Sequence, residues 1–258
     1  MGDDQQPTLW HIPISHYSEK ARWALDHKSV EPERRAPLPG GHAVVALWLT
    51  RGRHKTFPIL RLDGRNIGDS SAIIAALEER FPEPPLYPEG PQERRRALEL
   101  EDWFDEELGP HIRLLVFHEA LKEPEQFAEV AARMAPAPMA RFKAGAGAYA
   151  RAWARLRFGV GSARRADLAR TKVLEAWDRL EAELGDGQYL VGDTFTVADL
   201  TAAALFYPIV QPPEGPSAID RLPAAIERFR EPLRQRPGYH WVEEMFRRHR
   251  QRAVVDVA

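Results

Sequence analysis

The stretch TLWHIPISHYSEKARWAL, residues 8–25, decides how the chain begins to fold. Its first six residues form a short, largely apolar segment that ends at Pro13, and this composition favours a buried strand. From Ser18 onward the apolar side chains recur at the spacing of one helix face, which Trp23 widens. The sequence therefore predicts a strand, a turn and a helix, with Ser15 in the turn.

A hairpin and another helix are predicted further along. Residues 57–62 are typical of a strand that enters a tight turn at Asp63-Gly64 and pairs with a strand at Asn66-Ile67. Asp69-Ser70-Ser71 then offers N-cap side chains ahead of a helical face. Between the two parts, a strand or loop precedes a short apolar helix over residues 43–49. Together these segments predict an α/β arrangement with helices packed on a small sheet.

The pattern changes at Pro82. The stretch FPEPPLYPEGP, residues 81–91, holds too many prolines to continue a helix and is typical of an interdomain linker. Beyond it the apolar residues recur at helical intervals, as in Leu98, Trp103, Phe104, Leu108, Ile112 and Leu115, and in Leu168, Val173, Trp177, Leu180 and Leu184. We therefore expect a first domain over residues 7–82, a linker over 83–92 and an all-helical domain over 93–250.

Composition limits the classes of function. The 258 residues are 44% hydrophobic and 29% charged, as in a globular protein long enough for two small domains. The net charge of -2 gives no global field that would attract nucleic acid or anionic lipid. The lack of Cys excludes disulfides, thiolate metal sites and a cysteine nucleophile. With no leader-like start and no long apolar run, we expect a cytoplasmic protein without a metal, a membrane partner or a nucleic-acid partner.

Several short motifs occur in a fixed order around the linker. They are SHYSEKAR at residues 15–22, Phe57-Pro58, Asp69-Ser70, YLVGD at residues 189–193 and TVADL at residues 196–200. In this order they resemble the glutathione transferase superfamily, and a serine-type class in particular. The resemblance implies a thioredoxin-like domain before the linker, a helical bundle after it, a homodimer, and glutathione as co-substrate.

Ser15 receives the catalytic role from this resemblance. It stands where glutaredoxins and cysteine-type transferases have Cys and where serine-type transferases carry a hydroxyl, which can donate a hydrogen bond to the thiolate of glutathione. Lowering a thiol pKa by about two units from roughly 8.5 requires about 2.7 kcal/mol. A hydrogen bond to a charged group contributes about 1.5 to 3 kcal/mol, and a helix N-terminus about 0.3 to 1 more. No metal or protein base is then needed to form the thiolate. The alternative role for Ser15 is that it only caps the helix.

Two neighbours of Ser15 have alternative roles. Tyr17 is a rival hydrogen-bond donor, because other transferase classes use a tyrosine phenol, but its place two residues into the turn favours a role in the pocket wall. His16 replaces the proline of a glutaredoxin-type turn. We expect a solvated histidine there, with tuning of the thiolate as the alternative.

The resemblance also implies a glutathione site. Pro58 would be a cis proline that turns the N–H and C=O of Phe57 toward the cysteinyl part of glutathione. Asp69-Ser70 would hold the γ-glutamyl end at a helix N-terminus, with Asp where the family usually has Glu or Gln. His42 and Lys55 are candidates for the glycine carboxylate, or are plain surface.

The electrophile would lie against residues from both domains. The candidates are Ile12, Pro13, Tyr17, His111, Ile112 and Leu115, and the alternative for them is the core between the domains. The segment from Thr196 to Asp199 is predicted to be a capping box that serves folding and not catalysis.

The predicted function is conjugation of glutathione to a small hydrophobic electrophile. Ether cleavage, dehalogenation, or non-catalytic binding of glutathione or a hydrophobic ligand on the same fold are the alternatives. Residues 131–166 carry many basic and no acidic side chains, which fits either a solvated helix face or a basic rim over the site.

Overall fold

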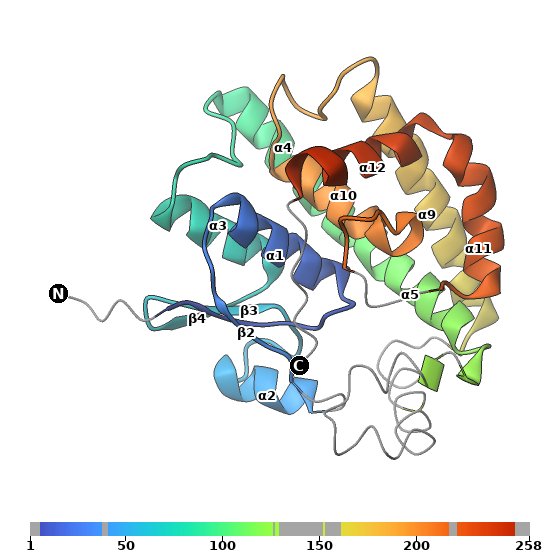
Figure 1. Cartoon of the computed structure of the whole chain (residues 1–258), viewed down its shortest axis with the longest axis horizontal. Helices are drawn as coiled ribbons and strands as arrows, with labels where there is room; N and C mark the ends of the chain where they lie inside the picture. Colours follow the sequence, from blue (N-terminus) through green and yellow to red (C-terminus); the bar gives the residue numbers. More distant parts are fainter. Residues whose placement is uncertain are drawn as a thin grey trace.

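A computed structural model describes residues 6–37, 41–125, 127–128, 152, 161–216 and 221–250. These residues form a small α/β domain followed by a helical domain (Figure 1). The fold class expected from the sequence, a thioredoxin-like domain followed by a helical domain, is confirmed.

Short strands build the sheet of the first domain: β1 (Thr8–Trp10), β2 (Glu33–Arg35), β3 (Ile59–Leu62) and β4 (Arg65–Gly68). Their order is β2-β1-β3-β4, with β1 parallel to β2 and antiparallel to β3, and β3 antiparallel to β4. In the turn between β3 and β4, Asp63 and Gly64 have φ of 48° and 74°, the left-handed conformation that this hairpin turn requires at both positions. The predicted turn is confirmed, and the segment expected as strand or loop is β2.

The helices of the first domain cover both faces of the sheet. Helices α1 (His16–His27) and α3 (Ser70–Arg80) lie on the face that turns toward the helical domain, and α2 (His42–Leu49) lies on the other (Figure 1). Since α1 also packs against the helical domain, charged as well as apolar residues of this helix are buried. The turn that carries Ser15 therefore lies at the boundary between the two domains.

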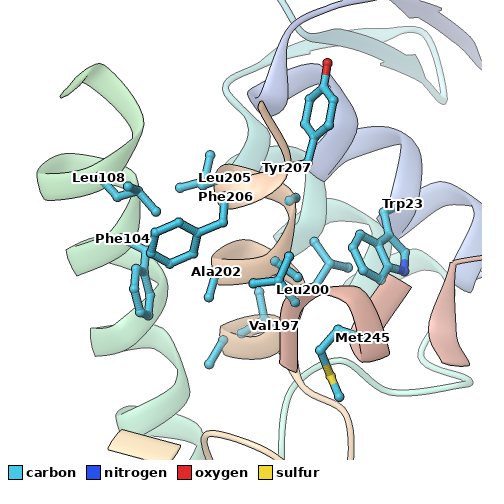
Figure 2. Close-up of a cluster of buried hydrophobic side chains, with 14 of the residues drawn as sticks. Trp23, Phe104, Leu108, Val197, Leu200, Ala202, Leu205, Phe206, Tyr207 and Met245 are labelled. Carbon is cyan, nitrogen blue, oxygen red and sulfur yellow. The ribbon is translucent and has the colours of Figure 1, made fainter. Parts of the chain in front are cut away.

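Helix α10 is the centre of the second domain, and every one of its residues is buried. Its Phe206 stacks on Trp177 with ring centroids 4.0 Å apart, and Trp23 of α1 meets Phe246 at 4.5 Å. Figure 2 shows side chains of α1, α10 and their neighbours meeting in this cluster, which joins the two domains in one core. The elements of the domain are α4 (Pro91–Trp103), a π-helical segment (Phe104–Leu108), α5 (Gly109–Ala120), α9 (Ala163–Leu184), α10 (Val197–Val210), α11 (Ala224–Arg230), a 3-10 segment (Glu231–Gln235) and α12 (Pro237–His249).

The proline-rich segment 81–91 is held at several points. Buried Lys28 forms an ion pair with Glu78 and donates to Pro84 O at 2.7 Å. The carboxylate of Glu78 also accepts from the N–H of Leu86 at 2.9 Å, and Leu86 O accepts from the N–H of Val197 at 2.8 Å. This segment thus connects α1, α3 and the start of α10 by hydrogen bonds, which fix its path.

The predicted capping box is present at the start of α10. The carboxylate of Asp199 accepts from the Thr196 N–H and hydroxyl, both at 2.8 Å, and from the Leu190 N–H at 2.7 Å. Burial raises the pKa of Asp199 to about 6, although these donors act to lower it. One buried carboxyl therefore organises both the helix start and the loop in front of it.

The segment between α4 and α5 has a π-helical register. The Gly109 N–H donates to the carbonyl five residues back, and the same register would pair Asp105 O with Pro110, which has no N–H. The Tyr17 hydroxyl donates to Asp105 O at 2.7 Å. Tyr17 thus supplies the donor that the helix lacks, and a Cβ on Gly109 would come 2.1 Å from its hydroxyl oxygen.

The capping box gives a first prediction. Asp199→Ala is expected to lower the free energy of unfolding by about 2 to 4 kcal/mol, because two buried N–H groups lose a charged acceptor. Asp193→Ala, which removes an exposed carboxylate in the same segment, should change it by less than about 0.5 kcal/mol. Urea unfolding measures both values, and similar losses in the two variants would contradict the assignment.

The contact between Gly109 and Tyr17 gives a second prediction. Gly109→Ala should lower the free energy of unfolding by about 1 to 3 kcal/mol, because the methyl group would overlap the Tyr17 hydroxyl. Gly161→Ala is the control, since a Cβ at that position meets nothing within 4 Å. In a Tyr17→Ala background the cost of Gly109→Ala should disappear. An additive cost in the double variant would show that the two residues do not interact.

Candidate functional site

Ser15 is the N-cap residue of α1. Its backbone is extended, at φ -83° and ψ 125°, and its Oγ accepts a hydrogen bond from the Ser18 N–H at 3.3 Å. The side chain is half-buried. Capping uses a lone pair of the hydroxyl oxygen, whereas a thiolate would receive the hydroxyl hydrogen. The two roles considered for Ser15 are therefore compatible in this geometry.

The backbone before Ser15 is held by hydrogen bonds. The Ser15 N–H donates to Ile12 O at 3.0 Å, and the Ile12 N–H donates to Ser18 Oγ at 3.1 Å. Arg22 donates through Nη2 to Pro13 O at 3.0 Å. These bonds fix the direction in which the turn presents the Ser15 side chain.

Arg22 is itself held in a buried charge cluster. Its guanidinium lies 2.8 Å from Glu19 and 2.8 Å from Nδ1 of His11, and Glu19 accepts from Arg250 Nε at 2.6 Å. Burial alone would raise the pKa of Glu19, but Arg250 and Arg22 outweigh it and lower the pKa. Burial, with Arg22 nearby, lowers the pKa of His11 to about 3, so this imidazole is neutral and accepts from Arg22. Pattern reasoning gave Glu19 and Arg22 no separate role, although their i, i+3 spacing on α1 was visible.

Lys20 fixes α1 against the start of α3. Its ammonium lies 2.8 Å from Ser71 Oγ, 2.8 Å from Glu101 Oε1 and 2.5 Å from Asp105 Oδ2. Burial alone would lower the pKa of Lys20, but the carboxylates of Asp105 and Glu101 outweigh it and raise the pKa. Lys20 therefore stays charged. Its contacts hold the N-termini of α1 and α3 in fixed positions relative to each other.

We expected a solvated loop histidine at position 16, and this was wrong. His16 is buried. Burial and the charge of Arg113 lower its pKa to about 3, so it is neutral. The physical reason is tertiary: the first turn of α1 packs against Gly109 at the start of α5. Tyr17, beside it, gives its hydroxyl hydrogen to Asp105 O, and the guanidinium of Arg113 lies 5.8 Å from its ring centroid.

Strand register brings the remaining candidates to the same end of the sheet. Trp10 pairs with Ile59, so the antiparallel register continues with Phe57-Pro58 beside His11 and Ile12, just before the Ser15 turn. Ile59 also pairs with Gly68, which places Asp69-Ser70 on the other side of Phe57-Pro58. The Phe57–Pro58 peptide bond is cis, as the resemblance implied, and both residues are buried. A second cis bond, Glu83–Pro84, was not predicted.

Asp69 has a strained backbone at the N-cap of α3. Its φ is 81°, a region that costs a non-glycine residue of order 1 to 3 kcal/mol. The exposed carboxylate accepts from the N–H groups of Ser71 at 2.9 Å and Ala72 at 3.3 Å. Its other lone pairs stay able to accept from a ligand.

Two further candidates lie beside Phe57. His42 begins α2, its Nε2 lies 3.0 Å from Pro37 O, and its ring meets that of Phe57 edge-on with centroids 6.0 Å apart. Burial lowers the pKa of His42. Lys55 is exposed two residues before Phe57.

The candidates for the electrophile pocket divide into two groups. Ile12, Pro13 and Tyr17 are half-buried around the Ser15 turn, whereas Ile112 and Leu115 are fully buried in the core, as in the alternative considered for them. His111 lies near charges of Glu107, Lys172 and Glu175, and burial lowers its pKa. On α5 the side chain that lies over Tyr17 is that of Arg113, which sequence reasoning missed.

Other sequence expectations concern a metal, a membrane and the basic segment. In the described ranges, no group of three or more His, Asp or Glu could hold a metal ion. Of the helices described, none is long and apolar enough to cross a membrane. The basic segment 131–166 lies outside the described residues, apart from residues 152 and 161–166.

Comparison with known proteins shows the family. Residues 9–85 match the family model of the glutathione S-transferase N-terminal domain, and residues 138–237 match that of the C-terminal domain. The chain is 26% identical over 209 residues to maleylacetoacetate isomerase of Dictyostelium discoideum, which covers 79% of this chain and 80% of that protein.

Solved structures share the fold. A β-etherase from Sphingobium sp. superposes with a TM-score of 0.60 at 22% identity, covering 93% of this chain and 99% of that one. A glutathione S-transferase from Methylobacterium radiotolerans, in complex with glutathione sulfonate, gives 0.55 at 23% identity, covering 92% and 93%. With both family models matched in order, and the Ser15 turn, cis Pro58 and the start of α3 at one end of the sheet, the chain belongs to the glutathione transferase superfamily.

Proposed function

We propose that this chain is a serine-type glutathione transferase in which Ser15 stabilises the thiolate of glutathione. The observation that carries the proposal is the position of Ser15 at the N-terminus of α1, in a hydrogen-bonded turn that follows Ile12, the residue that the strand register places beside the cis Phe57–Pro58 bond. The thiol proton passes to solvent, and the sulfur lone pair forms a bond to an electrophilic carbon of a small hydrophobic substrate. In a substitution the leaving group departs with the electrons of its broken bond, and in an addition to an activated double bond the displaced electron pair takes up a proton from solvent.

The energy required is within reach of these groups. A shift of about two units in the thiol pKa corresponds to about 2.7 kcal/mol. One hydrogen bond from Ser15 to the thiolate supplies about 1.5 to 3 kcal/mol, and the N-terminus of α1 about 0.3 to 1 more. The hydroxyl stays protonated throughout.

The rest of glutathione would lie along the same end of the sheet. We propose that the N–H and C=O of Phe57 pair with its cysteinyl part and that Pro58 holds them in that direction. The N-terminus of α3 at Ser70 would receive the γ-glutamyl carboxylate, and Asp69 its ammonium group. His42 and Lys55 would face the glycine carboxylate. The electrophile would lie over Ile12, Pro13 and Tyr17. His111 would lie at the edge of this pocket, and Ile112 and Leu115 would lie in the core behind it.

Isomerisation with glutathione as a catalyst is the second candidate, favoured by the 26% identity to a maleylacetoacetate isomerase along 79% of the chain. In conjugation or ether cleavage glutathione is consumed, whereas an isomerase adds and then releases the thiol. Assays that count glutathione consumed per substrate converted separate these chemistries. Calorimetry with glutathione, followed by a chromogenic electrophile, tests the non-catalytic alternative. We place the enzyme in the cytoplasm, where low-molecular-weight thiols are kept reduced.

The role of Ser15 gives a third prediction. Ser15→Ala should lower turnover by roughly ten- to two-hundredfold and raise the pKa of bound glutathione, while glutathione binding changes little. The control is Ser162→Ala, which removes the N-cap hydroxyl of α9 and costs similar helix stability. Ultraviolet absorbance of the thiolate reports the pKa. Unchanged turnover in Ser15→Ala, together with a large loss in Tyr17→Phe, would move the role to Tyr17.

The family also gives a fourth prediction, a homodimer about a twofold axis in which the first domain of one subunit meets the helical domain of the other. Light scattering at micromolar concentration should report twice the 29.3 kDa monomer mass. A monomer mass under those conditions would refute the dimer.

A further inference from the structure

The turn that carries Ser15 is bonded to the helical domain through Tyr207. This side chain rises from α10, and its hydroxyl donates to Ile14 O at 3.1 Å. Figure 2 shows the ring leaving the apolar cluster with its oxygen turned away from Phe206 and Leu205. Tyr207 is only 1% exposed, so water does not compete with Ile14 O for the hydrogen bond of its hydroxyl.

The acceptor, Ile14 O, belongs to the peptide unit between Ile14 and Ser15. The carbonyl of Ile14 and the N–H of Ser15 lie in one rigid plane. The N–H side of that plane is held by Ile12 O at 3.0 Å, and the carbonyl side is held by Tyr207. With both sides held, the plane has little freedom to rotate, and the direction of the Ser15 Cα–Cβ bond is set.

The surroundings of Tyr207 suit a permanent donor. Burial raises the pKa of its phenol; the charge of Arg22 acts to lower that pKa and the charge of Glu19 acts to raise it. Arg22 holds the preceding carbonyl, Pro13 O, from α1. Successive carbonyls of the turn are thus held from two different domains.

We propose that Tyr207 is a positioning residue for Ser15, through which the helical domain aims the hydroxyl at the glutathione sulfur. This inference rests on the proposed role of Ser15. Tyr207 touches neither substrate; it acts only through the Ile14–Ser15 peptide. Without its hydroxyl the plane would rotate, and the hydrogen bond from Ser15 to the thiolate would lengthen.

Tyr207→Phe tests the proposal, because it removes the hydroxyl and keeps the ring in the core. The matched control is Tyr239→Phe on α12, whose buried hydroxyl also donates at 3.1 Å to a backbone carbonyl, that of Val210, the last residue of α10. Both variants should lose similar stability. Only Tyr207→Phe should lower kcat by about threefold to tenfold and raise the pKa of bound glutathione by roughly half a unit to one unit, with KM for glutathione within about twofold.

A second measurement does not depend on glutathione. The chain has no Cys, so Ser15→Cys introduces a single thiol whose pKa follows from the rate of alkylation against pH. We expect that pKa to rise when Tyr207→Phe is added and to stay unchanged when Tyr239→Phe is added. Equal thiol pKa values in the three folded proteins would overturn the positioning role.

The two proposals fail in different ways. If Ser15→Ala leaves the pKa of bound glutathione unchanged, Ser15 is not the thiolate donor, and the inference in its catalytic form is overturned with it. If Ser15→Ala raises that pKa but Tyr207→Phe behaves as Tyr239→Phe does, the function stands and the role of Tyr207 is refuted.

Discussion

Helix α1 is covered on both sides, and this forces its charged side chains Glu19, Lys20 and Arg22 to find partners inside the protein. An ion without a partner in the interior would cost several kcal/mol. Each side chain therefore reaches a different part of the chain: Glu19 reaches Arg250 at the end of α12, Lys20 reaches α3 and α4, and Arg22 reaches the turn before Ser15.

These contacts serve geometry more than net stability. Buried ion pairs add little stability over well-packed apolar side chains, but a displaced partner leaves a costly charge behind. The relative positions of α1, α3 and the helical domain are thus narrowly defined. We infer that the fixed spacing between the N-termini of α1 and α3, where glutathione would bind, results from this constraint.

Two tyrosines cross the same boundary in opposite directions. Tyr17 leaves α1 and bonds to the π-helical segment at Asp105 O, while Tyr207 leaves α10 and bonds to Ile14 O before α1. In both cases a phenol that cannot ionise at neutral pH satisfies a backbone carbonyl across the interface. The first domain carries the Ser15 hydroxyl, and the second domain fixes its surroundings.

Much of this protein followed from local patterns. Periodicity and turn residues predicted the helix after Ser15, the Asp63-Gly64 turn and the capping box at Asp199, because each depends on residues close together in the sequence. Motif order predicted the family and the cis bond at Pro58. The register that brings Phe57-Pro58 beside both Ile12 and Asp69 then follows from the pairing of β1, β3 and β4.

Tertiary structure alone decided the rest. The burial of His16, the π register that leaves Asp105 O to Tyr17 and the bond from Tyr207 to Ile14 could not be read from the sequence. For Ile112 and Leu115 the sequence left pocket and core open, and the structure places both in the core. The physical reason is distance along the chain: Tyr207 and Ile14 are 193 residues apart. The sequence by itself determined the elements and their family, whereas the packing of α1 between sheet and bundle decided which side chains surround Ser15.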